Sequence, residues 1–191
     1  VGGYKRALEG VKGVLASLGL AFGAFAIVRD AFNIGKDFEA SIASLSAITG
    51  ATGDTLEEFK GKVIDVATNT KKSATEVAKA FELIGSAKPE LLANADALAL
   101  VTEQAIILSQ ATGLDLDVSA SALTNTLNQF SLGAEKAAEV VNILAAGSQA
   151  GAAPVNEINE ALSKFGTVAA SSGVGVNESV AAIEVLAEKS I

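Results

Sequence analysis

The chain has 191 residues, half of them apolar, with 18 Gly, 2 Pro and neither His nor Cys. Without imidazoles and thiols, this chain alone builds no Ser-His triad, Cys-His dyad or ordinary zinc site, and it has no disulfide framework. The net charge of −8, with 14 dispersed basic residues, disfavours nucleic-acid binding, because neutralising phosphates requires clustered Lys and Arg.

The N-terminal segment contains an uncharged run of 16 residues at 13–28, GVLASLGLAFGAFAIV. A helix that spans a bilayer needs about 20 apolar residues, so the run is slightly short. Gly19 and Gly23 have the GxxxG spacing that permits close helix approach, and Phe22 and Phe25 adjoin them. We expect a long apolar helix that is buried or self-associates, with membrane contact through these four residues as the alternative.

Two helices with capping-box starts are predicted next. The sequences TLEE at 55–58 and SATE at 73–76 place a hydroxyl three residues before a carboxylate. Gly85 is expected to end the second helix, and Pro89 suits the first position of a short helical turn. Apolar residues recur at helical spacing after both starts: Leu56, Phe59, Val63 and Val66, then Val77, Phe81 and Ile84.

The rest of the chain repeats this alternation of helix and small-residue turn. A helix is predicted from about Asp96 to Ala111, with Gly113 as its break. Residues 148–153 are expected to form a loop, and the last helix starts near Asn177. Apolar stripes mark the helices: Leu98, Val101, Ala105 and Leu108; Leu123, Leu127 and Phe130; Val140 and Leu144; Ile158, Leu162, Phe165 and Ala169; Val180, Ile183 and Ala187.

A weak internal match relates residues 75–84 to residues 177–186, at a displacement of 102 residues. Two explanations stay open. Either an array repeats a structural unit, or two N-capped amphipathic helices merely look alike. Together the helices, caps and short turns predict an all-α fold, an array or bundle of antiparallel amphipathic helices with the long apolar helix at its N-terminus. We expect two parts, a helical segment at 1–48 and a helical core domain at 49–191.

The order of several segments carries a family resemblance. These segments are AITGAT, SATEVAKAF, IGSAKPELL, LNQF, NILAAGSQAGAA and KFGTVAASSGVGVNESVAAIEVLA. In this order and spacing, over about three quarters of the chain, the sequence resembles the core region of bacteriophage tail tape measure proteins. Each segment is only a helix with its caps, so the order carries the resemblance rather than any single motif.

Acidic pairs are the remaining candidates for chemistry. Asp115 and Asp117 adjoin Gly113, but the regular ligand series and terminal Glu of an EF-hand are missing. Carboxylates at a helix N-terminus explain them more simply. The pairs at 57–58 and 157–160 are interpreted as solvated or first-turn acids, because acid-base catalysis needs two carboxylates tuned across a cleft. We expect no catalytic residue, no metal site and no cofactor.

The resemblance implies a structural role in a phage or prophage tail. The parent protein would set tail length during assembly and assist DNA delivery through the host envelope. Its implied partners are other copies of itself, the tail tube and tail assembly chaperones, with the host membrane as a further contact and no sequence-specific nucleic acid. The implied location is the lumen of the tail tube in the virion, and the host cytoplasm during assembly. A membrane-perturbing secreted helical protein and a helical adaptor or scaffold module are the alternatives.

Overall fold

The computed structural model describes residues 23–189, with side-chain environments from residue 35 onward. Contacts divide the chain into two compact units, residues 1–40 and 41–191. Helix α2 (Gly23–Thr49) begins in the first unit, and its residues from Ser41 onward belong to the second. The predicted division at residue 48 stays a prediction.

The second unit consists of helices joined by short turns, with no β-strand among residues 41–189. From Gly53 onward it holds seven α-helices and two short 3-10 turns, in agreement with the predicted all-α fold. In chain order these are α3 (Gly53–Thr70), α4 (Ala74–Ala87), η1 (Pro89–Ala93), α5 (Ala95–Thr112), α6 (Leu116–Gln129), η2 (Ala134–Lys136), α7 (Ala137–Ala150), α8 (Val155–Ser171) and α9 (Val176–Glu188).

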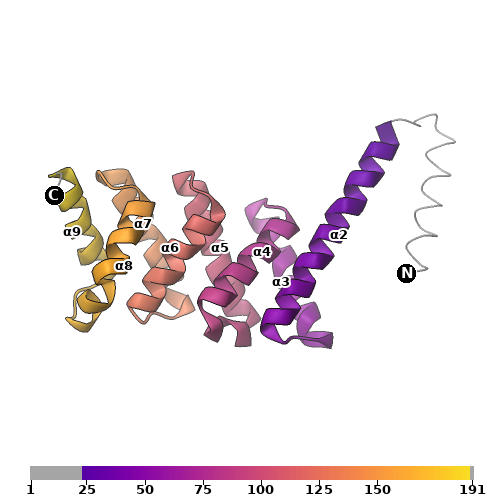
Figure 1. The fold of residues 1–191 in the computed structure, drawn as a ribbon, viewed down its shortest axis with the longest axis horizontal. Coiled ribbons are helices and arrows are strands. Elements are labelled where there is room, and N and C mark those ends of the chain that lie inside the picture. The colour runs from indigo at the N-terminus through magenta and orange to yellow at the C-terminus, as the bar shows by residue number, and fades with distance from the viewer. Residues whose placement is uncertain (1–22, 190–191) are drawn as a thin grey trace. The chain divides into compact units, whose positions relative to one another are not determined.

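These helices stack side by side in two layers (Figure 1). Helices α3, α5, α7 and α9 pack in succession to form one layer, and α4, α6 and α8 form the other. Each helix also packs on its sequence neighbour across the layers, as short connections between antiparallel helices require. The apolar stripes meet between the layers, where the largest fully buried side chains include Phe81, Leu98, Leu123, Leu144 and Ile158.

Two predicted starts behave differently. Ser73 is the N-cap of α4 and accepts the Glu76 N–H, while the Glu76 carboxylate accepts the Ser73 N–H at 3.0 Å, so this capping box is confirmed. The box predicted at Thr55 is wrong. Helix α3 starts two residues earlier, at Gly53, with Thr52 as an N-cap that makes no side-chain bond. Thr55 therefore lies within the helix.

Gly85 does not end its helix, because α4 continues to Ala87. The residue is buried inside the last turns, and a Cβ there would meet the side chain of Leu92 from η1. It is a site of close approach rather than a stop. Pro89 and Gly113 take their predicted places, at the start of η1 and in a left-handed conformation with φ 72° after α5.

The expected long apolar helix at the N-terminus finds no support in the described residues. Residues 13–22 lie outside them, and α2 includes charged residues from Arg29 onward. None of the helices that the structure describes combines the length and the apolar character needed to cross a bilayer.

The internal match aligns α4 with α9, and both helices return an N3 glutamate to the N-cap N–H, at 3.0 Å in α4 and 2.9 Å in α9. The two helices nevertheless lie in different layers of the array. A repeat of the array would carry a helix to an equivalent place in the same layer. The match therefore reflects two similarly capped amphipathic helices.

Candidate functional site

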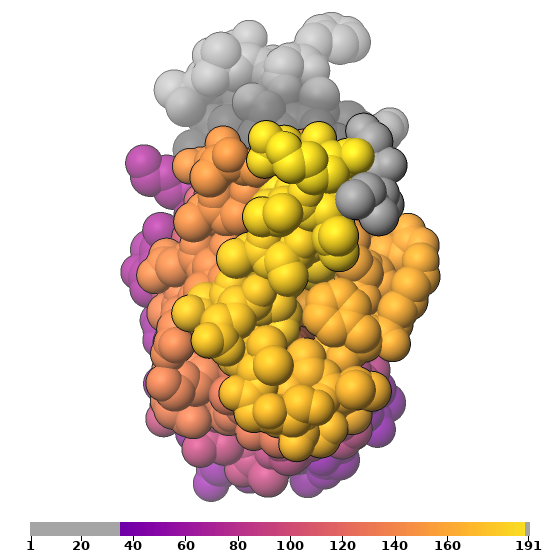
Figure 2. All heavy atoms as spheres, turned by 90° about the vertical axis from the view of Figure 1, so that its left-hand side faces the viewer, coloured from indigo at the N-terminus to yellow at the C-terminus, as the bar shows by residue number. Residues whose placement is uncertain are grey.

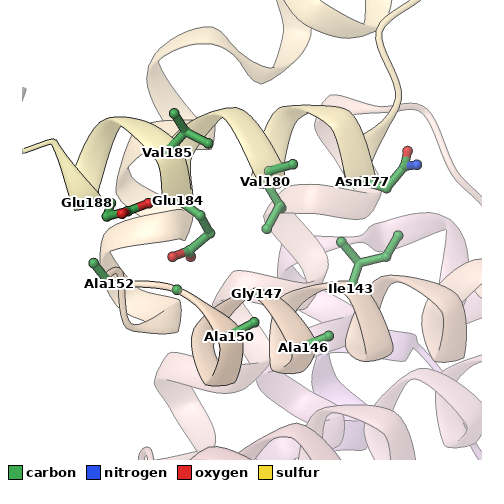
Figure 3. A pocket seen from close by; sticks show the side chains of 12 residues that line it. Ile143, Ala146, Gly147, Ala150, Ala152, Asn177, Val180, Glu184, Val185 and Glu188 are labelled. Carbon is green, nitrogen blue, oxygen red and sulfur yellow. The ribbon is translucent and has the colours of Figure 1, made fainter.

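A groove with a volume of about 660 Å³ lies between α7 and α9 (Figure 3). Small residues of α7 form its floor and one face of α9 forms its wall. Val180 projects over Gly147, and Glu184 projects toward the loop that follows α7. The lining residues are Ile143, Ala146, Gly147, Ala150, Gly151, Ala152, Asn177, Val180, Ala181, Glu184, Val185 and Glu188.

Gly147 inside α7 and Gly151, the C-cap directly after it, lie against α9. A Cβ on Gly147 would lie 2.6 Å from Cγ1 of Val180, closer than two non-bonded carbon atoms approach in proteins. A Cβ on Gly151 would collide with the Glu184 carboxylate. Because neither glycine carries a side chain, the α9 face lies directly on the end of α7. The spacing of Gly147 and Gly151 is the GxxxG signal of close helix approach.

Glu184 is the polar centre of the groove. Its Oε2 accepts the backbone N–H of Ala153 at 3.1 Å, which ties α9 to the α7–α8 loop. Its Oε1 is buried and has no hydrogen-bond partner. A second carboxylate, on Glu188, lies one turn further along α9 at the same wall. No nucleophile or imidazole is available to these acids, because the remaining lining side chains are aliphatic except for Asn177.

The comparisons with known proteins agree with the expected resemblance. A family model described as phage-related minor tail protein matches residues 60–191. The chain belongs to this family. It is also 30% identical, over 186 residues and 97% of its length, to a tape measure protein of Pneumococcus phage Dp-1. The match covers 16% of that relative, so the tail protein chain spans about a sixth of its length. No solved structure matches.

The acidic pairs singled out in the sequence of this tail protein lie on exposed surfaces. Asp115 is the N-cap of α6 and Asp117 lies in its first turn, where the carboxylate accepts the adjacent Val118 N–H at 3.0 Å. Glu160 pairs with Lys164 at 2.9 Å along α8. This ion pair holds the pKa of the Glu160 carboxyl below its usual value. These positions agree with the interpretation as helix-start and surface acids.

Metal-ligating clusters were not expected, and the described residues contain no group of three His, Cys, Asp or Glu side chains suited to a metal ion. The four residues proposed for self-association or membrane contact remain untested. Gly19 and Phe22 lie outside the described residues, while Gly23 begins α2 and Phe25 lies in its first turns.

The α7–α9 groove was missed in the sequence because residues 148–153 were predicted as a loop. Helix α7 instead continues to Ala150, so Gly147 and Ala150 lie on a helix that ends at Gly151. The GxxxG spacing at Gly147 and Gly151 was the available signal. The same spacing at Gly19 and Gly23 stands in a more apolar sequence, where it is the stronger signal.

Proposed function

We propose that this chain is a folded helical segment of a tail tape measure protein, a longer protein that sets tail length during assembly and assists DNA delivery through the host envelope. The supporting observation is the 30% identity to a named tape measure protein over 97% of the chain. Because the match covers 97% of the chain, it takes in nearly all of the array from α3 to α9. The role would be structural and non-enzymatic, within the tail tube of the virion and in the host cytoplasm during assembly.

The charge of the chain fits a place beside DNA. With 22 acidic against 14 basic residues, it would repel the phosphate backbone rather than hold it, which suits a protein that must leave the tube with or ahead of the genome. The partners under this proposal are other copies of the chain, the tail tube subunits and tail assembly chaperones. No sequence-specific contact with nucleic acid is expected.

An in-frame deletion in the phage tests the proposal. Removing residues 95–175 joins Asn94, the N-cap of α5, to Val176, the first residue of α9. Helices α5 to α8 are lost, and α9 then follows α4 across the layers as α5 does in the parent. Tails measured by electron microscopy should be uniformly shorter.

Two further observations make this experiment decisive. Circular dichroism and sedimentation of the deleted chain check that it still folds. As a matched control, Gly61→Ala alters an exposed position of α3 and should leave tail length unchanged. Tails of parental length, assembled in normal numbers with the folded deletion protein, would refute a measuring role for this segment.

For Gly19, Gly23, Phe22 and Phe25 we propose helix self-association, with host membrane contact as the alternative use of the same residues. The double variant Gly19→Ile with Gly23→Ile would force the backbones apart and weaken association by about 1–3 kcal/mol, the cost of overpacking. Sedimentation of the full chain should then shift toward monomer, whereas Gly35→Ile in α2, where a Cβ meets nothing within 4 Å, should not. Unchanged association of the double variant would contradict the proposal.

Liposome flotation separates the tail role from the membrane-perturbing alternative. The full chain and a form lacking residues 1–34 are compared, because the second compact unit starts at residue 41. Strong binding and leakage caused only by the full chain would favour membrane perturbation. A stable complex with a folded host protein, formed outside any virion, would favour the adaptor alternative.

A further inference from the structure

The array is unevenly covered at its C-terminal end, where α8 and α9 lie. Helix α6, inside the same layer as α8, packs on both α4 and α8, and seven of its 14 residues are buried. Helix α8 packs on α6 within this layer and on no further described helix beyond it, and five of its 17 residues are buried. The outer side of α8 thus lacks the neighbour that α6 has.

The direction of this bare side follows from two contacts. Gly166 and Asn159 of α8 face α6, because a Cβ on Gly166 would meet Gln129 and the Asn159 side chain accepts a hydrogen bond from Asn125 at 3.3 Å. At about 100° per residue, Val168 lies roughly 160° around the helix from Gly166. Val168 therefore faces away from α6, and Phe165 is turned toward the same side.

The bare side carries an exposed apolar side chain beside the charged residues Glu157 and Lys164, which the same rotation per residue places there. Val168 is 66% exposed, the highest value among the exposed large apolar side chains of the described residues. On the neighbouring helix α9, Val185 is 57% and Leu186 is 48% exposed. By contrast, Leu100 and Ile107 in the middle of the array are 38% and 39% exposed. Figure 2 looks onto this end, where α9 and α8 lie side by side and no described helix covers them.

We propose that the α8–α9 end is an internal surface of a longer array, covered by an amphipathic helix that the polypeptide beyond residue 191 supplies in the full-length tail protein. This helix would occupy the next place in the α4–α6–α8 layer and pack its apolar stripe on Phe165, Val168 and Leu186. The inference rests on the proposed place of the chain in a tape measure protein.

Two observations favour this occupant over a second copy of the chain. Every internal helix of the array is covered by its neighbours one and two places along the chain, so a following helix repeats the packing rule already present. The tape measure relative is also much longer than the chain, which matches only 16% of it, so the parent has ample polypeptide for further helices. Stacked helical units bury their apolar faces only against such neighbours.

The absence of cysteine makes a direct test available, because Val168→Cys introduces a single thiol. Its rate of reaction with a maleimide is measured in the 191-residue chain and in the full-length phage protein. We expect the rate to fall at least tenfold in the full-length protein. The matched control is Thr167→Cys, an exposed neighbour on another side of α8, whose rate should be the same in both proteins.

Equal Val168→Cys rates in the two proteins would overturn the proposal, since the end would then be bare. Protection already present in the 191-residue chain and lost on dilution would also overturn it, because a second copy would be the cover. A second variant, Val168→Asp, should leave the melting temperature of the 191-residue chain unchanged and lower that of the full-length protein. None of these results depends on tail length, so a failure here and a failure of the measuring role are distinguishable.

Discussion

A methyl group added at Gly147 has two opposing effects on stability. Gly147 lies inside α7, so Gly147→Ala removes the conformational penalty of a helical glycine, which is worth about 0.8–1.0 kcal/mol. The new Cβ would also lie 2.6 Å from Cγ1 of Val180 on α9. Val180 is β-branched and 3% exposed, so its side chain has one strongly preferred rotamer and does not turn away easily from the new methyl group.

Overpacking of this kind costs about 1–3 kcal/mol, so the contact outweighs the helical gain. We expect Gly147→Ala to lower the free energy of unfolding by roughly 0–2 kcal/mol. Gly61→Ala is the matched control, because Gly61 is exposed inside α3 and a Cβ there meets nothing within 4 Å. This control should raise the free energy of unfolding by about 1 kcal/mol.

Urea denaturation of the two variants and the parent gives the two changes directly. A double-mutant cycle isolates the contact: in a Val180→Ala background the clashing Cγ1 is gone, and Gly147→Ala should become stabilising like Gly61→Ala. If Gly147→Ala already stabilises the otherwise unchanged chain by about 1 kcal/mol, the close approach of α7 and α9 does not constrain this position and the reasoning fails.

Three further predictions concern caps and a buried charge. Ser73→Ala should destabilise the chain by about 1 kcal/mol in urea denaturation, whereas Thr55→Ala, which removes no cap bond, should be near neutral. The Ser73 hydroxyl and N–H hold the pKa of Glu76 below its ordinary value of 4.5. The stability difference between the parent and Glu76→Gln should therefore be full above pH 4.5 and vanish as the pH falls through the folded pKa. A stability difference that grows in acid would contradict this. Lys88 is 4% exposed, but its two partners, Glu90 and Asn128, are on the surface. Lys88→Met should therefore cost under about 1 kcal/mol and Lys88→Ala about 2 kcal/mol or more by calorimetry.

Local signals were sufficient for the parts of the fold that depend on few neighbours. The capping box at Ser73 is closed by residues within one turn, and Gly113 is required by a left-handed φ of 72° directly after α5. Pro89 likewise fits the start of η1 because its fixed φ suits that position. Such features depend only on residues that are adjacent in the chain, so a single sequence is enough to predict them.

Glycines placed by tertiary packing could not be assigned in this way. Gly85 was predicted to be a helix stop because a stop and a close approach use the same residue type, and only the position of Leu92 decides between them. The same ambiguity concealed the groove at Gly147 and Gly151. The pairing of helices two places apart in the chain was also out of reach, because amphipathic stripes show that a helix is buried and not which helix covers it.

The two-layer stacking changes how this segment would contribute to a measured length. Deleting residues 95–175 removes 81 residues. If they ran as one extended helix, the tail should lose about 120 Å, at 1.5 Å per residue. In the array the four removed helices are two from each layer, so each layer becomes shorter by two helix-to-helix spacings. If the array axis follows the tube, the tail should lose about 16–20 Å. Electron micrographs separate these values easily. A loss near the larger value would mean that the segment unfolds into single helices inside the tail, whereas a loss near the smaller one would mean that it keeps this fold and that the rest of the parent protein determines most of the length.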